Sequence, residues 1–299
     1  MAVACPRTKG LMGGGELPGR RAPAAAFRFH AVLALALLVS APVARAGVAE
    51  ASVCGLGSGE SARIAAVLEA GDLRLEDGRT VRLAGVVTDF GEDGQAAALR
   101  AVLERRLQGQ TARLYPAGDV DRYGRQAAYL VAGEAGGRTL QEELLAAGLA
   151  VWRPGEATGP CREALAVAEG AAARARRGLW RVFPLPARNP AAVSRFEGRY
   201  AIVAGRVMSS GQTRQRDYLN FGPVWRKDFT VQIPGGARRA FAALGKEPQR
   251  LVMGDVSVRG VVFEEGGPAI EAWLPEQVER LATGRDAGAD EGKAEAVER

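Results

Sequence analysis

The chain has 299 residues, with 40 basic and 34 acidic side chains and a formal net charge of +6. This length accommodates one large domain or two modest ones. Histidine occurs once, at His30, and cysteine three times. Zinc sites built from several histidines or from four thiolates are therefore excluded.

The N-terminal segment has the pattern of a secretory signal. Arg20, Arg21 and Arg28 precede a short apolar run at 31–39, and small residues follow up to Ala46. A charged region, an apolar region and an A-x-A site in this order predict cleavage after Ala46 and a periplasmic or secreted protein, with 1–46 as signal peptide. An uncleaved anchor is the alternative, although the run is shorter than the roughly 20 residues that span a bilayer.

Removal of this segment changes the charge and the available chemistry. Residues 1–46 contain six basic residues and one acidic residue, so the remainder has 34 and 33 and a net charge of +1. Global charge then gives no argument for nucleic-acid binding, which must depend on local patches. His30 is lost as well, so carboxylates, arginines, hydroxyls or a bound hard cation must carry any chemistry.

Two cysteines, Cys54 and Cys161, remain after the segment is removed. In an exported protein such a pair is expected to form a disulfide. Two free thiols are the alternative.

The first half alternates between strand and helix patterns. Its centre is the stretch DLRLEDGRTVRLAGVVTDF at 72–90, in which apolar and polar residues alternate around Asp77-Gly78, a strong hairpin signal. The pattern predicts three strands, one helix and two strands, followed by two further helices. The predicted strands are 62–68, the two strands of the hairpin, 111–115 and 126–131, and the helices are 94–107, 139–147 and 161–177.

The second half repeats this order after a proline-rich stretch. We expect a linker at 181–197, a second domain at 198–282 and a disordered tail rich in Gly, Ala, Glu and Asp at 283–299. Strands are predicted at 200–208, 217–221, 229–233, 255–263 and 269–273, with a helix at 237–244. The fold class is therefore mainly β with α: two tandem five-stranded barrels of the OB type, the first at 62–180 with C-terminal helices.

Four sequence blocks of the first domain together resemble the staphylococcal nuclease, or thermonuclease, family. They are the hairpin LRLEDGRTVRLAG, the turn DRYGR at 121–125, LQEELLAAGLA at 140–150 and ARARRGLW at 173–180. The resemblance covers 62–180. In the second domain, YLNFG at 218–222 and DFTV at 228–231 are similar to C-terminal domains that accompany this nuclease domain in bacterial envelope proteins.

The resemblance implies a mechanism and also a defect. In the family a hard cation, normally Ca²⁺, is held by carboxylates, a glutamate activates water, and two arginines neutralise the phosphoryl oxygens. Arg82 and Arg125 match the arginines. Gly71 and Val87 stand at the two metal-binding aspartates, and Phe90 stands at the general base.

We therefore hypothesise a degenerate domain that needs no cofactor and binds nucleic acid or another polyanion, with weak or no phosphodiester hydrolysis. Arg82 and Arg125, together with Arg122 and Tyr123, would form the anion site, because guanidinium groups suit phosphate geometry. An envelope protein is a further possible partner. A structural or interaction protein of the cell envelope is a separate alternative.

The other alternative is an active nuclease that uses displaced carboxylates and Ca²⁺. Asp72 and Asp89 each lie one residue from a lost position, and Glu69 is a third candidate. In a strand, a shift of one residue turns the side chain to the opposite face, so a loop would have to absorb it.

The second domain offers aromatic and basic residues for base stacking. The aromatic candidates are Tyr218, Phe221, Trp225 and Phe229, and burial in the barrel is the alternative for each of them. The basic candidates lie in two loops, Arg214 to Arg216 and Trp225 to Lys227.

Overall fold

The computed structural model describes residues 54, 56, 58–91, 93–133, 137–155 and 161–282. The predicted signal at 1–46 and the predicted disordered tail at 283–299 lie outside these residues. Among the described helices, none combines the length and the apolar character that crossing a membrane requires.

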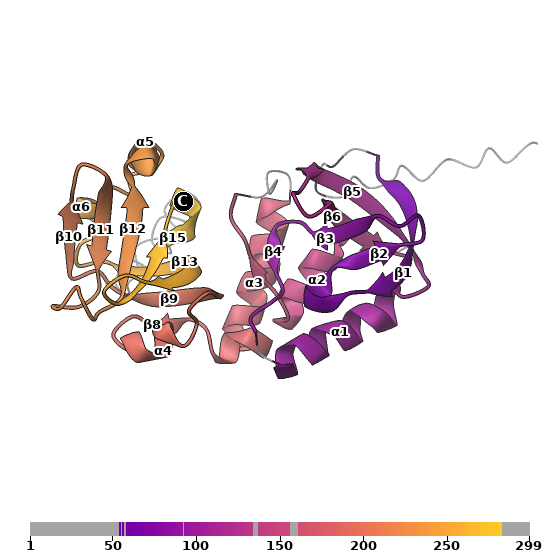
Figure 1. Cartoon of the computed structure of the whole chain (residues 1–299), viewed down its shortest axis with the longest axis horizontal. Helices are drawn as coiled ribbons and strands as arrows, with labels where there is room; N and C mark the ends of the chain where they lie inside the picture. Colours follow the sequence, from indigo (N-terminus) through magenta and orange to yellow (C-terminus); the bar gives the residue numbers. More distant parts are fainter. Residues whose placement is uncertain are drawn as a thin grey trace, which may run out of the picture. The chain divides into compact units, whose positions relative to one another are not determined.

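The first half contains a closed barrel of five strands in the order β1-β2-β3-β6-β5 (Figure 1). The parallel pair is β3 with β6, and the other neighbours are antiparallel. This topology confirms the barrel predicted for the first domain. The strands are β1 (Glu60–Val67), β2 (Leu73–Leu75), β3 (Thr80–Leu83), β5 (Thr111–Val120) and β6 (Arg125–Ala132).

The hairpin between β2 and β3 follows the sequence pattern. On β2 the apolar Leu73 and Leu75 are buried, whereas Arg74 between them is exposed, and Leu73 pairs with the buried Val81 of β3. The turn is tight because Gly78 adopts φ +88° and the Asp77 carboxylate accepts a hydrogen bond from the backbone N–H of Arg79 at 3.0 Å. The barrel closes because β1 pairs with β5 through its first half and with β2 through its second half.

Three helices and a short strand pair complete the first half. The helices are α1 (Asp93–Leu107), α2 (Leu140–Ala147) and α3 (Arg162–Arg174), and β4 (Val86–Val87) pairs with β7 (Val151–Trp152). Helix α2 begins with a capping box between Thr139 and Glu142 and ends at Gly148, which adopts φ +70°. These local signals explain why its predicted bounds were accurate.

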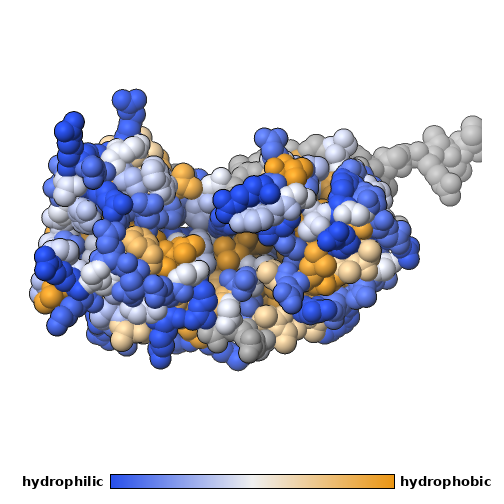
Figure 2. Space-filling model, viewed as in Figure 1, coloured by the Kyte–Doolittle hydropathy of each residue, from blue (hydrophilic) through white to orange (hydrophobic). Residues whose placement is uncertain are grey.

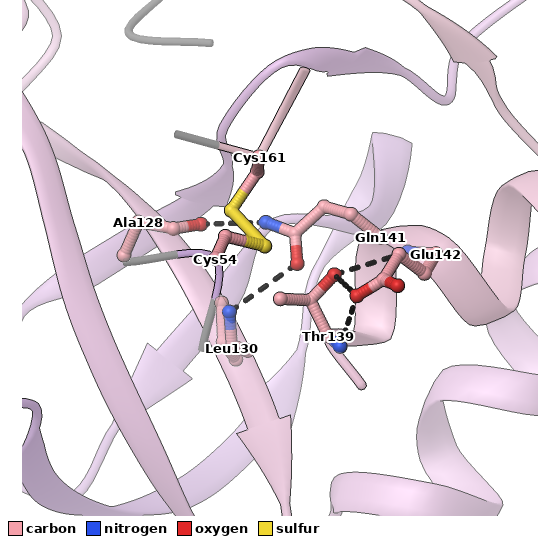
Figure 3. The surroundings of a disulfide bond; sticks show 7 residues. All are labelled: Cys54, Ala128, Leu130, Thr139, Gln141, Glu142 and Cys161. Carbon is pink, nitrogen blue, oxygen red and sulfur yellow. Dashed lines mark hydrogen bonds between the residues drawn. A yellow bond between two sulfur atoms is a disulfide. The ribbon is translucent and has the colours of Figure 1, made fainter. Parts of the chain in front are cut away.

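The two cysteines expected to pair form a disulfide in the structure, 107 positions apart in sequence (Figure 3). Beside it lies Gln141, a fully buried polar side chain on α2. Its amide donates to the carbonyl of Ala128 at 2.8 Å and accepts from the N–H of Leu130 at 3.2 Å. Gln141 therefore joins α2 to strand β6 while its own polar groups stay satisfied.

The second half is built on an eight-stranded sheet with the order β10-β11-β12-β14-β13-β9-β8, and β15 pairs with β13 off this path. Its strands are β8 (Leu185–Pro186), β9 (Tyr200–Arg206), β10 (Ser209–Gln212), β11 (Arg216–Asn220), β12 (Thr230–Pro234), β13 (Asp255–Glu264), β14 (Pro268–Glu271) and β15 (Val278–Arg280). Its helices are α4 (Pro190–Ser194), α5 (Arg238–Ala243) and α6 (Pro248–Leu251).

The five-stranded barrel expected in this half is not confirmed, because the sheet has eight strands and its path does not close. Five of them, in the order β11-β12-β14-β13-β9, nevertheless repeat the order of the first barrel, including a parallel pair between β12 and β14. The chain passes from one side of the sheet to the other between β9 and β10, which follow each other in sequence but are not neighbours in the sheet. There the N–H of Val207 bonds to Gly254 on one side, and that of Met208 bonds to Asn220 on the other.

The segment 181–197, expected to be a linker, is packed into the protein instead. Strand β8 pairs in parallel with β9, helix α4 carries proline at its N-terminus, and Phe183, Leu185 and Val193 are buried. The prolines that suggested a linker are compatible with a two-residue strand and with the first turn of a helix.

The two halves share a hydrophobic core. One continuous cluster of buried side chains contains Phe90, Val151 and Trp180 from the first half together with β-strand residues of the second. Beside it, Glu169 on α3 forms a buried ion pair with Arg259 on β13, at 2.9 Å. On the face seen in Figure 2, by contrast, hydrophobic residues appear in separate small groups between hydrophilic ones.

Candidate functional site

Both arginines singled out in the sequence line one pocket of about 380 Å³ at the end of the β2–β3 hairpin. The pocket combines three guanidinium groups with three carboxylates, so its formal charges balance. The charged residues that line it are Arg82, Arg125, Arg153, Asp72, Asp89 and Asp121.

The turn at 121–125 places Arg125 in this pocket. The Asp121 carboxylate accepts hydrogen bonds from the backbone N–H groups of Tyr123 at 2.9 Å and Arg125 at 3.0 Å. Gly124 adopts φ +74°, which closes the turn at a conformation that favours glycine. The backbone amide of Arg125 is the largest of the causes that hold the pKa of Asp121 below its usual value.

Two carboxylates hold the Arg125 side chain in place. Its Nη1 lies 3.0 Å from Asp72 Oδ2, and its Nη2 lies 2.9 Å from Asp121 Oδ2. Burial opposes the charge of this guanidinium, but the hydrogen bonds that it donates to Asp72 and Asp121 outweigh burial and raise the pKa of Arg125. Arg82 Nε lies 3.8 Å from the same Asp121 oxygen, so one carboxylate links the two arginines.

The aspartates considered as displaced metal ligands have other partners. Asp72 is bound to Arg125, and Asp89 folds back on its own turn to accept a hydrogen bond from the N–H of Gly91 at 2.9 Å. Glu69 lies exposed in a single turn of 3-10 helix at 69–71 and does not line the pocket. In the part of the chain that the structure describes, no three His, Cys, Asp or Glu residues form a group that could hold a metal ion.

Two of the three positions at which the resemblance places acidic residues of the family have structural contacts. Gly71 is buried with φ +86°, and a Cβ atom there would lie 3.2 Å from Leu99 and 3.3 Å from Leu103. Any other residue at this position would therefore strain the backbone and press on helix α1. Val87 belongs to strand β4, where it pairs with Val151.

The third position, Phe90, lies in the shared core. It is only 1% exposed, and its ring centroid lies 5.7 Å from that of Phe183, which in turn lies 5.5 Å from Phe196. Arg199 of the second half donates hydrogen bonds to the carbonyls of Phe90 at 3.1 Å and Gly91 at 3.4 Å. The backbone and the side chain at the expected general-base position are thus both held by the second half.

The structure also brings together the residues predicted to surround the anion site. Tyr123 is 66% exposed, and the guanidinium carbons of Arg122 and Arg125 lie 4.8 Å and 5.2 Å from its ring centroid. Arg122 additionally donates to the Tyr123 hydroxyl at 2.7 Å. An exposed aromatic ring with two cations over it provides both a stacking surface and anion-binding groups.

Sequence reasoning missed Arg153 and Arg199, two basic residues of a neighbouring pocket of about 780 Å³ that shares Val87, Asp89 and Arg153 with the first. From the second half this pocket adds Arg199 and also Arg216, which belongs to one of the two loops named as basic candidates in the sequence. The position of Arg153 depends on a long-range contact that no local sequence pattern indicates. Its N–H donates a hydrogen bond to the carbonyl of Gly85 at 2.9 Å, next to the two-residue pairing of β4 with β7.

A closed five-stranded barrel with helices, carrying two arginines on a hairpin and an adjoining turn, has the OB-type architecture on which oligonucleotides and oligosaccharides bind. More specifically, residues 74–182 match the family described as Staphylococcal nuclease homologue, so this part of the chain is a staphylococcal nuclease-like domain. No curated protein matches the chain. Active members of this family depend on Ca²⁺.

Proposed function

We propose that this protein is an exported staphylococcal nuclease-like protein whose nuclease domain is catalytically impaired and binds nucleic acid or another polyanion. The main observation that supports impaired catalysis is the burial of Phe90. An aromatic side chain that is 1% exposed, at the position of the water-activating glutamate, can neither accept a proton nor reach a water molecule.

The expected loss of activity is large. Absence of a general base commonly lowers a rate by about 10²–10⁴-fold. Gly71 and Val87 at the two aspartate positions remove carboxylates that would hold the cation, and with them part of its stabilisation of the developing charge. Of the groups that the family uses for catalysis, the two arginines Arg82 and Arg125 remain, and we propose that they bind phosphate without cleaving it.

Polyanion binding at this site should be weak and only modestly sensitive to salt. A phosphate that approaches Arg125 competes with Asp72 and Asp121, which already bind the guanidinium at about hydrogen-bonding distance. Arg122 and Tyr123 at the exposed edge are the first groups that an incoming phosphate or base would meet. Because the pocket as a whole is charge-balanced, it neutralises few phosphates, and few counterions are therefore released on binding.

A plasmid-degradation assay with Ca²⁺, Mg²⁺ or EDTA, combined with a gel shift at low salt, tests the proposal. We expect no metal-dependent cleavage, and a shift of the DNA that weakens in Arg125→Ala. Arg79→Ala is the matched control, because this exposed arginine lies on the same hairpin but pairs with Glu60 outside the pocket. Metal-dependent cleavage that disappears in Arg125→Ala would contradict the proposal, and a complete absence of DNA affinity would favour a structural protein of the envelope.

One observation favours the active alternative. Asp72 and Asp89 line the same pocket as Arg82 and Arg125. A cation that displaced Arg125 from Asp72 would recover one ligand, but Asp89 would have to leave its turn to supply another. The cleavage assay decides between the two functions directly.

Export is supported by the pairing of Cys54 with Cys161, since disulfides persist mainly in oxidising compartments. Fractionation of the producing cells, followed by mass determination of the mature N-terminus, tests it. A processed chain in the periplasm or medium is expected, and an unprocessed cytosolic chain would contradict the proposal.

We also propose that the second half is an OB-type barrel whose first strand is divided. Support comes from the strand order and the parallel β12–β14 pair. In this interpretation β9 and β10 are two parts of one strand, which meets β13 on one side and β11 on the other.

A further inference from the structure

A third pocket, of about 520 Å³, lies entirely within the second half. Most of it is formed by the neighbouring strands β11 and β12, by the end of β10 with the segment that leads to β11, and by the loop between β13 and β14; the loop between β11 and β12 adds Trp225 and Arg226. If β9 and β10 count as the first strand, β11 and β12 are the second and third strands of an OB barrel, and the segments before β11 and after β13 are the two loops beside their face. That is the face on which OB folds bind oligonucleotides and oligosaccharides.

Aromatic rings form one wall of this pocket. Tyr218 comes from β11 and Trp225 from the loop before β12, and Trp225 is 59% exposed. The loop is ordered by its own hydrogen bonds, because Asp228 Oδ2 accepts from the N–H of Val224 at 2.7 Å. The tryptophan is therefore held at the pocket edge before any ligand arrives, which lowers the entropic cost of binding.

The floor of the pocket is polar. Gln232, only 3% exposed, accepts a hydrogen bond from Arg216 at 2.7 Å and donates one to Glu265 at 3.1 Å. Thr230 lies two residues away on the same face of β12, and its Oγ1 is buried without a hydrogen-bond partner among the described residues. A buried hydroxyl without a partner calls for an explanation, and a ligand hydroxyl in the pocket would supply one.

We infer that this pocket binds a neutral oligosaccharide. The C–H face of a sugar ring packs on Trp225 and Tyr218, while amide, hydroxyl and carboxylate groups of the floor meet the sugar hydroxyls. Charge offers little attraction for a phosphate backbone, because Arg226 is the one cation among the described residues of the lining and its one carboxylate, Glu265, pairs with Arg216 at 3.2 Å. Arg226 itself lies over the Trp225 ring, with its guanidinium carbon 4.8 Å from the centroid.

This inference is independent of the proposal for the nuclease domain, because it concerns another ligand on another surface. The test uses the full chain on an array of neutral and acidic oligosaccharides, followed by calorimetry with the best ligand and with a ten-residue thymidine oligonucleotide. We expect binding of a neutral oligosaccharide that changes less than twofold between 50 and 500 mM NaCl, since uncharged contacts are not screened.

Two exposed tryptophans of the second half give a matched pair of variants. Trp225→Ala should weaken oligosaccharide binding at least tenfold, whereas Trp273→Ala should leave it unchanged, because Trp273 is similarly exposed at 55% but does not line the pocket. Absence of any bound neutral oligosaccharide would overturn the inference, as would equal losses in the two variants. Oligonucleotide binding that is salt-dependent and lost in Trp225→Ala would assign the pocket to single-stranded nucleic acid instead.

Discussion

Replacing Phe90 with alanine should destabilise the whole protein, because this side chain belongs to the core that the two halves share. Phe-to-Ala changes in a core cost about 3–5 kcal/mol. The contact with the Phe183 ring, at 5.7 Å between centroids, places Phe90 in the upper part of this range, since aromatic pairs add about 0.5–1.5 kcal/mol beyond area burial. At about 2–4 °C per kcal/mol for domains of this size, the melting temperature should fall by roughly 6–20 °C.

Urea denaturation and thermal melting of purified Phe90→Ala measure this loss. Asp89→Ala is the control, because the neighbouring side chain is exposed and should change the free energy of unfolding by less than about 1 kcal/mol. Phe90→Glu, which restores the carboxylate of the family, should destabilise the protein at least as much and should not produce cleavage in Ca²⁺. A melting temperature of Phe90→Ala within 2 °C of the parent would refute the reasoning, as would Ca²⁺-dependent cleavage by Phe90→Glu.

Three further predictions concern stability. Glu169→Gln leaves the buried Arg259 without its charge partner and should cost about 3–5 kcal/mol in urea denaturation; a much smaller loss would show that the pair does not join the halves. Cys54→Ser should lower the free energy of unfolding by up to about 4–5 kcal/mol, because the bond to Cys161 closes a loop of 107 positions; addition of reductant should lower the stability of the parent and leave the variant unchanged. Because the folded-state pKa of Asp121 is lowered, its contribution is present above about pH 3.8 and is lost as pH falls through the folded-state value. The stability difference between the parent and Asp121→Asn should therefore shrink in acid denaturation below that pH, and a difference that stays constant would contradict this sign.

The order of strands and helices was predictable because local signals mark most of the elements. Asp77-Gly78 and the turn at 121–125 fix two connections, and the capping box at Thr139 fixes the start of a helix. The two-residue pair of β4 and β7 carries no periodicity, so the sequence could not reveal it. The segment 181–197 was misassigned because its prolines are equally compatible with a linker and with the short elements found there.

The arginines of the candidate site were predictable from the motif, but their surroundings were not. Spacing alone does not indicate that Asp72 and Asp121 bind the same guanidinium, since these residues lie on different elements. Nor does it indicate that Arg199, more than a hundred positions away, bonds to the carbonyl of Phe90. Contacts of this kind depend on how the two halves pack, which no local pattern encodes.

The packing of Phe90 also bears on whether displaced carboxylates can restore a metal site. A shift of one residue that brought Asp89 to the position of the general base would turn Phe90 out of the shared core, because successive side chains of an extended segment point in opposite directions. Exposing a fully buried phenylalanine costs about 1.5–3 kcal/mol in transfer free energy alone, before any cavity is counted. The shift would also break the hydrogen bond from Arg199 to the Phe90 carbonyl. Contacts with the second half therefore stabilise the segment containing Asp89 and Phe90 in the register that places Phe90 at the general-base position. Binding of a cation would have to offset the free energy of exposing Phe90 before the shifted register could contribute to catalysis.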